Sequence, residues 1–278
     1  KEYDKKSIQP SISIIMPAYN AKKYIGEAIE SILNQTFTDF ELIISDDCST
    51  DNTWDIIQKY AKKDKRIVAY RNKKNLKSCL NYIKAMNLAE GKYIAIMDND
   101  DISYPYRIER QFNFFERHSD VGIVGGVMEI VDNNGNYIAK RKYYLVDSEI
   151  RKHIFKYSPF SHPLVMIRKS VLKQVGYYNP KYAPADDYDL YFRIGKVSKF
   201  ANLPDVLLKY RVLSNSITNK STRRMALSTI AVRRAYGNNY PYQMTLFDRI
   251  LTFIQYFTIF VIPDKIRLWL FNLLRNSR

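Results

Sequence analysis

Glycine is scarce in this 278-residue sequence, and the nine glycines present form no glycine-rich phosphate-binding loop. Neither a GxGxxG dinucleotide fingerprint nor a Walker P-loop pattern is present. The segment after the first predicted strand, PAYNAKKYIG, also lacks the glycines that a nucleotidyltransferase usually has there. These absences exclude the classes built on such loops and argue against nucleotidyl transfer.

Cysteine and long apolar runs are scarce as well. Cys48 and Cys79 have neither metal-ligand spacing nor a disulfide framework, which suits a reducing compartment. The first ten residues, KEYDKKSIQP, are charged and lack an apolar core, so we expect no secretory signal peptide there. An uncharged run of thirteen residues, from Ile250 to Ile262, is too short to span a bilayer.

Acidic residues are fewer than basic ones: the chain has 28 aspartates and glutamates and 44 lysines and arginines, which gives a net charge of +16. About half of the excess lies in the last fifth of the chain, where ten basic and two acidic residues follow from position 220 onward. Such a field attracts nucleic acid, an anionic membrane or phosphorylated substrates. The charges there accompany continuous aliphatic and aromatic surface, which adds nothing to phosphate binding, so we expect no nucleic-acid partner.

The first hundred residues alternate strand and helix patterns. Strands are expected at 11–17, 40–47, 66–71 and 93–98, and helices at 22–35, 53–63 and 78–91, the last closed by Gly91. This alternation predicts an α/β fold with a doubly wound, mostly parallel sheet and a Rossmann-like nucleotide-binding half. Ligands bind beyond the carboxyl ends of such strands. We therefore expect the strand ends MPAYN, SDD and MDNDD to converge on one site.

Three carboxylates follow the fourth of these strands in the stretch YIAIMDNDDISYP. Asp98, Asp100 and Asp101 repel one another unless a cation or hydrogen-bond donors offset the repulsion. One aspartate could simply cap a helix that starts near Pro105. A cap needs one carboxylate, so the presence of three favours a divalent-metal site.

The second half of the chain changes character. Residues 121–145 are typical of two strands joined by a turn around Asn134 and Gly135, and a short helix and a strand at 163–170 follow. In APADDYDLYFRIGK, Asp186 and Asp187 open a helix, where either is also suited to an N-cap or first-turn role. A carboxylate outside the metal shell can take a proton from an acceptor hydroxyl as general base. A metal-held diphosphate and such a base are what group transfer from a nucleotide diphosphate requires.

Four segments, in this order, resemble family 2 glycosyltransferases: SISIIMPAYN, ESILNQTFTDFELIISDDCSTDNT, AEGKYIAIMDNDD and SHPLVMIRKSVLKQVGYYNPKYAPADDYDLYFRI. The resemblance spans roughly residues 10–216. It implies an inverting, metal-dependent enzyme of GT-A fold that uses Mn²⁺ or Mg²⁺ and a nucleotide-sugar donor. It also implies a catalytic domain at 1–218, with a nucleotide-binding half at about 10–101 and an acceptor half at about 102–218. A basic, amphipathic helical region at 219–278 follows.

The resemblance assigns roles on the nucleotide side. Pro17, Ala18 and Tyr19 match the segment that lines the base pocket. Asp47 matches the carboxylate that hydrogen-bonds a uracil ring, and Arg211 matches an arginine expected to approach the diphosphate.

The carboxylates after the fourth strand match a DxDD pattern. Asp98 is expected near the ribose or donor sugar, and Asp100 on the metal. Asp101 completes the pattern, with a helix cap as the alternative.

On the acceptor side, Asp187 matches the general base. Asp186 replaces the glutamate usual before it, and this shorter side chain is a candidate for positioning the acceptor. His162 lies in the acceptor-side segment, where it contacts donor or acceptor or serves the structure.

The C-terminal segment DKIRLWLFNLLRNSR has an amphipathic pattern, with an apolar stripe of Ile266, Trp269, Leu270, Leu273 and Leu274 flanked by basic residues. This composition is typical of a helix that lies on an anionic membrane surface. The alternatives are a helical pair folded back on the catalytic domain and a dimer interface.

Together these features predict a hexosyltransferase that moves a hexose or N-acetylhexosamine from a UDP-sugar to a lipid-linked or oligosaccharide acceptor in bacterial surface-polysaccharide biosynthesis. We expect it in the cytoplasm, peripheral on the inner face of the cell membrane. One alternative is a non-catalytic nucleotide-binding or membrane scaffold protein of the same fold, which would be marked by loss of Asp100 or Asp187; both are present. The other is a nucleotidyltransferase.

Overall fold

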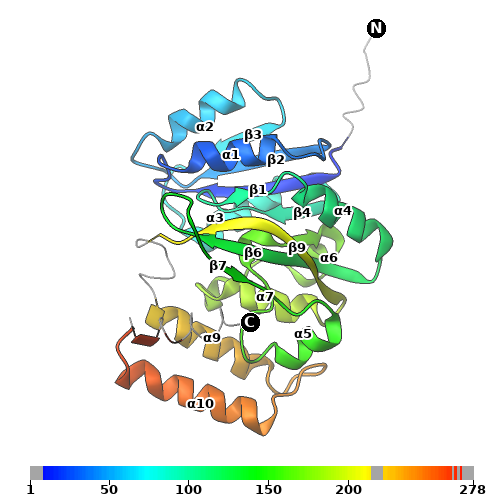
Figure 1. Ribbon diagram of the computed structural model, residues 1–278, viewed down its shortest axis with the longest axis vertical. Helices are drawn as coiled ribbons and strands as arrows, with labels where there is room; N and C mark the ends of the chain where they lie inside the picture. Colours follow the sequence, from blue (N-terminus) through cyan, green and yellow to red (C-terminus); the bar gives the residue numbers. More distant parts are fainter. Residues whose placement is uncertain (1–8, 214–221, 265, 268–269, 271–278) are drawn as a thin grey trace.

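The first half of the chain builds the expected alternation of strands and helices. In this computed structural model, which describes residues 9–213, 222–264, 266–267 and 270, the elements are β1 (Ile12–Ala18), α1 (Ile25–Leu33), β2 (Phe40–Asp46), α2 (Thr53–Ala61), β3 (Ile67–Arg71), α3 (Ser78–Asn87) and β4 (Tyr93–Ile96) (Figure 1). β1 pairs in parallel with β2 and β4, and β2 pairs in parallel with β3. The predicted parallel, nucleotide-binding-type half is confirmed.

The second half extends the same sheet with mixed strand directions. Its elements are β5 (Ile102–Ser103), α4 (Arg107–Arg117), β6 (Val121–Val131), β7 (Tyr137–Arg141), α5 (Asp147–His153), η1 (His162–Leu164), β8 (Met166–Arg168), α6 (Lys169–Val175), η2 (Pro180–Tyr182), α7 (Asp186–Ile194) and β9 (Lys199–Arg211). The order across the sheet is β3-β2-β1-β4-β8-β6-β9-β5, and β7 pairs with β6. β8 is antiparallel to β4 and β6, whereas β6 and β9 are parallel.

Alternating side chains of the central strands feed two cores, one on each face of the sheet. In β1, Ile14 and Met16 pack with α1, α2 and α4, whereas Ile15 packs with α3, α6 and α7 on the opposite face. Because successive strand residues point to opposite faces, a strand buried on both sides is apolar at nearly every position. The helices change faces between β1 and β4, which lie side by side, so this is the point where a ligand is expected to bind.

One expectation about the local fold was wrong, and one strand was not predicted. α3 ends at Asn87 with Leu88 as its C-cap, so Gly91 does not close it. A Cβ on Gly91 would lie 2.5 Å from the backbone nitrogen of Ser13, so glycine is required there by close approach to β1. β9 was not predicted from the sequence. Its pairing with β6 shifts register between Asn202 and Val206, on either side of Pro204, as is usual where proline occurs in a strand.

Two C-terminal helices, α9 (Thr222–Tyr236) and α10 (Leu246–Val261), lie beyond the sheet at the bottom of Figure 1. α9 packs against α7 and η2, and α10 packs against α9. The predicted domain boundary at 218 falls outside the described residues. Among the described helices, none has the length and apolar content needed to cross a membrane.

Candidate active site

The ends of β1, β2 and β4 are joined by hydrogen bonds at one edge of the sheet. The Asp47 amide donates to the Ala18 carbonyl oxygen at 2.8 Å, next to the half-exposed Tyr19. The Asn99 side-chain amide donates to the Pro17 carbonyl oxygen, also at 2.8 Å. The structure thus brings the predicted base-pocket segment between the two acidic segments that follow β2 and β4.

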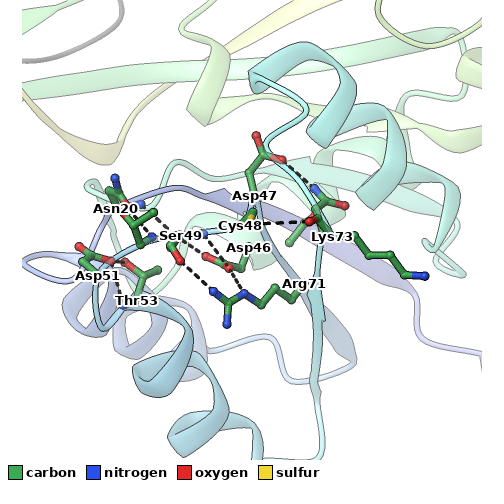
Figure 2. Close-up of polar contacts among 12 residues, drawn as sticks. Asn20, Asp46, Asp47, Cys48, Ser49, Asp51, Thr53, Arg71 and Lys73 are labelled. Carbon is green, nitrogen blue, oxygen red and sulfur yellow. Dashed lines mark hydrogen bonds and ion pairs between the residues drawn. The ribbon is translucent and has the colours of Figure 1, made fainter.

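The neighbouring carboxylates at the end of β2 have different surroundings (Figure 2). Buried Asp46 accepts a hydrogen bond from the Ser49 amide at 3.1 Å and forms an ion pair with Arg71, whose Nε lies 3.2 Å away. These contacts hold the loop after β2 in place. Figure 2 shows Asp47 pointing away from this cluster, toward the segment that leads into α3.

Asp47 accepts three hydrogen bonds from that segment. The donors are the Asn72 side-chain amide at 2.8 Å and the backbone amides of Leu76 and Lys77 at 2.8 and 2.9 Å. A carboxylate has about four acceptor positions. Asp47 therefore holds the edge of the base-side segment, and these three donors leave about one of its acceptor positions unused.

The three carboxylates after β4 form a cluster that fits a metal ion. One oxygen from each of Asp98, Asp100 and Asp101 can be chosen so that all lie within 4.8 Å of one another. Asp98 Oδ1 accepts a hydrogen bond of 2.5 Å from the Tyr82 hydroxyl. Asp101 is buried, and its Oδ2 has no hydrogen-bond partner among the residues that the structure describes. An oxygen-only donor set with an unsatisfied buried oxygen is what Mg²⁺ and Mn²⁺ sites use.

Burial and repulsion from neighbouring carboxylates make Asp100 and Asp101 hard to ionise in the absence of a cation. Burial, followed by the charge of Asp98, raises the pKa of Asp100 to about 7. Burial, Asp100 and Asp98 raise the pKa of Asp101 well above its ordinary value. The helix-cap alternative was wrong, because α4 begins at Arg107 and its N-cap residue, Tyr106, makes no side-chain cap hydrogen bond.

A buried arginine that the sequence analysis missed lies beside this cluster. Arg107 is fully buried, and its Nη2 donates to the Ile96 carbonyl oxygen at 2.7 Å. Burial lowers its pKa to about 9, although the charges of Asp101 and Asp98 oppose the shift. Full ionisation of the three carboxylates beside this one buried cation would leave a net charge of −2, which a divalent cation would neutralise. The sequence feature that could have revealed it is the position of Arg107 beside Ile108, on the face of α4 that is buried.

Arg211 fastens the acidic loop to two other elements. Its backbone amide donates to Asp101 Oδ1 at 2.8 Å, and its Nε donates to the Asp100 carbonyl oxygen at 3.0 Å. Its Nη1 donates to the Asn133 carbonyl oxygen at 3.1 Å, and its Nη2 pairs with the half-exposed Glu27 at 2.6 Å. A diphosphate contact by Arg211 therefore requires exchange with Glu27, and that role remains a prediction.

The second acidic pair opens α7. The N-cap residue is Ala185, without a side-chain cap hydrogen bond, so neither Asp186 nor Asp187 is the N-cap; both lie in the first turn. Asp187 Oδ1 accepts from the Tyr188 amide at 2.7 Å. Burial raises the pKa of Asp187 to about 6, with His162 opposing and Asp186 adding to the shift. A carboxylate that titrates near neutral pH is suited to accept a proton in catalysis.

Three aromatic side chains connect the acidic cluster after β4 with the acidic pair at the start of α7. His162 Nε2 lies 2.8 Å from the Tyr178 hydroxyl, and its ring meets the Tyr82 ring edge-on with centroids 5.0 Å apart. Tyr82 in turn holds Asp98, while His162 acts electrostatically on Asp187. His162 thus lies between Asp98 of the acidic cluster and Asp187 of the acidic pair. Tyr82 and Tyr178 were missed, because α3 and the loop before α7 approach each other only in the folded chain.

The curved α/β sheet, with carboxylates gathered at its switch point and a second acidic pair opposite, is the GT-A fold of glycosyltransferases. The family model described as Glycosyl transferase family 2 matches residues 13–176, and the chain belongs to this family. A glycosyltransferase of Methanocaldococcus jannaschii is 39% identical over 73% of this chain and 71% of its own. The O-antigen biosynthesis glycosyltransferase WbnJ of Escherichia coli is 36% identical over 78% of this chain and 84% of its own.

Solved structures agree with the fold. The TarS 1–349 structure from S. aureus, in complex with UDP-GlcNAc, matches 82% of this chain and 67% of its own, with a TM-score of 0.67 and 21% identity. Another crystal structure of S. aureus TarS also matches 82% of this chain, and the matched part makes up 40% of that TarS chain. The mannosyltransferase PcManGT from Pyrobaculum calidifontis, in complex with GDP-Man and Mn²⁺, matches 91% of this chain and 70% of its own, with a TM-score of 0.63 and 17% identity. The predicted family and fold are therefore confirmed, whereas the roles of single residues remain predictions.

Proposed function

We propose that this glycosyltransferase transfers a hexose or N-acetylhexosamine from a UDP-sugar to a lipid-linked or oligosaccharide acceptor during bacterial surface-polysaccharide biosynthesis, with inversion at the transferred carbon. One observation carries the proposal: a carboxylate cluster that fits a metal ion lies at the switch point, and the contacting rings of Tyr82 and His162 link it to Asp187. The relationship to WbnJ supports a polysaccharide product, because that relative is named for O-antigen biosynthesis.

The nucleotide preference rests on Asp47. TarS binds UDP-GlcNAc and PcManGT binds GDP-Man, so the fold accommodates either base. Three protein donors already occupy the Asp47 carboxylate, which leaves about one acceptor position. Uracil presents a single ring N–H, whereas guanine presents a ring N–H and an amino group side by side. The single remaining position suits uracil, with Pro17, Ala18 and Tyr19 lining the base pocket.

In the proposed mechanism, the acidic cluster holds the donor. Asp100 would hold Mn²⁺ or Mg²⁺, Asp98 would contact the ribose or donor sugar, and Asp101 would support the site through its unsatisfied oxygen. A divalent cation bound there neutralises charge on the departing diphosphate. Arg107 binds the Ile96 carbonyl oxygen at the end of β4 and Arg211 binds the Asp100 carbonyl oxygen, so the two arginines hold the backbone of the acidic segment in place.

Asp187 acts on the acceptor. It takes the proton from the attacking hydroxyl, and the oxygen displaces the UDP group from the opposite side of the sugar carbon, which inverts the configuration. Asp186 and His162 position the acceptor or the donor sugar beside it. We also propose that the enzyme is cytoplasmic and binds the inner face of the cell membrane through its C-terminal region, where lipid-linked acceptors are found.

The proposal is tested by incubating the full chain with a panel of UDP- and GDP-sugars and Mn²⁺ or Mg²⁺, with and without lipid-diphosphate acceptors. We expect release of UDP that requires the metal and is stimulated by one acceptor class, and the product should have the opposite anomeric configuration to the donor. The Asp187→Asn variant is the matched control. Turnover of GDP-sugars alone, or full activity in excess EDTA, would contradict the donor or the metal assignment respectively.

A further inference from the structure

The outer face of α10 is apolar and exposed. Its side chains are between 48% and 67% exposed and recur at helical spacing: Phe247, Ile250, Phe253, Ile254, Phe257 and Phe260, here called the α10 apolar face. On the opposite side of the helix, Asp248, Thr252 and Ile259 are buried, and Ile259 packs with Ala226 and Ile230 of α9. A surface helix of a globular protein normally places polar residues outward. Six large exposed apolar side chains on one face of a helix therefore indicate an interaction surface.

Basic side chains surround the α10 apolar face. Lys156 Nζ lies 5.5 Å from the Phe247 ring centroid, and the Arg223 guanidinium carbon lies 4.8 Å from that of Phe260. The guanidinium carbon of Arg234, from α9, lies 5.4 Å from the ring of Tyr256. An apolar centre with a cationic rim is complementary to a bilayer whose headgroups are negative.

We infer that the α10 apolar face lies flat on an anionic lipid bilayer and inserts its phenylalanines between the headgroups. α10 is 16 residues long, or about 24 Å, which is shorter than the roughly 30 Å hydrocarbon core that a spanning helix must cross. A second copy of this chain fits less well, because a two-fold interface would bring the same basic rim against itself. Membrane attachment in general belongs to the proposed function; the inference assigns it to this surface.

The location differs from the predicted stripe in the following segment. Within that stripe, Ile266 and Leu270 are exposed, at 50% and 37%, whereas Trp269, Leu273 and Leu274 lie outside the described residues. The predicted alternative of a helical pair folded back on the catalytic domain also holds in part, since α9 packs on α7 and α10 packs on α9. Packing on the catalytic domain and binding to a membrane therefore involve opposite sides of the α9–α10 pair.

Polar contacts fix this surface to the catalytic part of the molecule. Buried Arg233 of α9 donates to Gln255 of α10 at 2.6 Å and to the Lys156 carbonyl oxygen at 2.8 Å. The Tyr236 hydroxyl donates to Asp189 of α7 at 2.9 Å. Because α7 carries Asp187 in its first turn, a bilayer under α10 would hold the active site at a set orientation.

The test compares binding of the full chain to vesicles of phosphatidylcholine alone and of phosphatidylcholine mixed with phosphatidylglycerol, measured by co-sedimentation. The Phe253→Glu/Phe257→Glu variant should lose about tenfold or more of its affinity for the mixed vesicles. Tyr137→Glu/Ile138→Glu on β7 is the matched control, because those side chains are 61% and 54% exposed and the charge change is the same. The control should bind like the unmodified chain.

Four further measurements keep the outcome decisive. Ile250→Glu, one turn away, should weaken binding in the same direction, and thermal unfolding should be unchanged in each variant because the side chains are exposed. Normal vesicle binding by both α10 variants would overturn the inference. So would a lipid-free dimer, seen by sedimentation velocity, that Phe253→Glu/Phe257→Glu dissociates. Release of UDP from the UDP-sugar panel in the presence of the acceptors is measured in parallel: its absence in the unmodified chain would defeat the proposed function while leaving this inference standing.

Discussion

Replacing Asp187 with asparagine should separate donor binding from catalysis. Asparagine has nearly the same shape, and its side-chain oxygen can still accept the 2.7 Å hydrogen bond from the Tyr188 amide, so the first turn of α7 should persist. It cannot take a proton. Loss of a general base usually lowers turnover by a factor on the order of 10² to 10⁴, which corresponds to about 2.7–5.4 kcal/mol of barrier.

The assay is the initial rate of transfer at saturating donor and acceptor, with UDP affinity measured by calorimetry in the presence of Mn²⁺. Asp187→Asn should lose turnover within that range and retain its affinity for UDP. Asp186→Asn is the matched control, since it removes the same charge from the neighbouring position, and its loss should be smaller. Near-normal turnover of Asp187→Asn would refute the assignment and make Asp186 the first candidate.

The raised pKa of Asp187 also predicts a pH dependence. Since the base is active only when ionised, kcat/KM should rise with pH through about 6 and then level off. The folded protein holds this proton to a higher pH than the unfolded chain does, so the carboxyl lowers stability as pH rises from about 4 to 6. Asp187→Asn should therefore raise the free energy of unfolding at pH 8 by at most about 3 kcal/mol, which is measured as a higher unfolding temperature. This gain should vanish near pH 4. Equal stability at pH 8 would argue against a buried charge.

Three further variants test the acidic cluster. Asp100→Ala should abolish metal-dependent UDP binding in calorimetry, and an unchanged affinity would remove Asp100 as a ligand. Tyr82→Phe removes the hydroxyl that donates to Asp98 and should weaken UDP-sugar binding about tenfold or more, while unchanged binding would make this contact dispensable. Arg107→Met leaves the carboxylates without their buried cation and should lower the free energy of unfolding by about 3 kcal/mol; chemical denaturation measures this, and added Mn²⁺ should recover part of the loss.

Local pattern determined much of this protein. The strands β1, β2 and β4 were predictable because a parallel strand covered on both faces must be apolar at nearly every position. α1 was predictable for a related reason, since its buried residues recur at the spacing of one helical face. The carboxylates after β4 were recognisable because like charges so close in sequence stay close in any fold.

Tertiary structure decided what the isolated charges do. Arg107 and Arg110 lie in the same helix and look equivalent in the sequence, yet one is fully buried beside the acidic cluster and the other is exposed. Arg211 binds the backbone of Asp100 across 111 positions of sequence, and the contact of its side chain with Glu27 spans 184. Short-range periodicity reports which face of an element is buried, but not which distant element covers that face. The placement of β1 beside β4 in the sheet, the contacts that link Asp98 to His162 through Tyr82, and the outward face of α10 therefore depended on the packing of elements far apart in the chain.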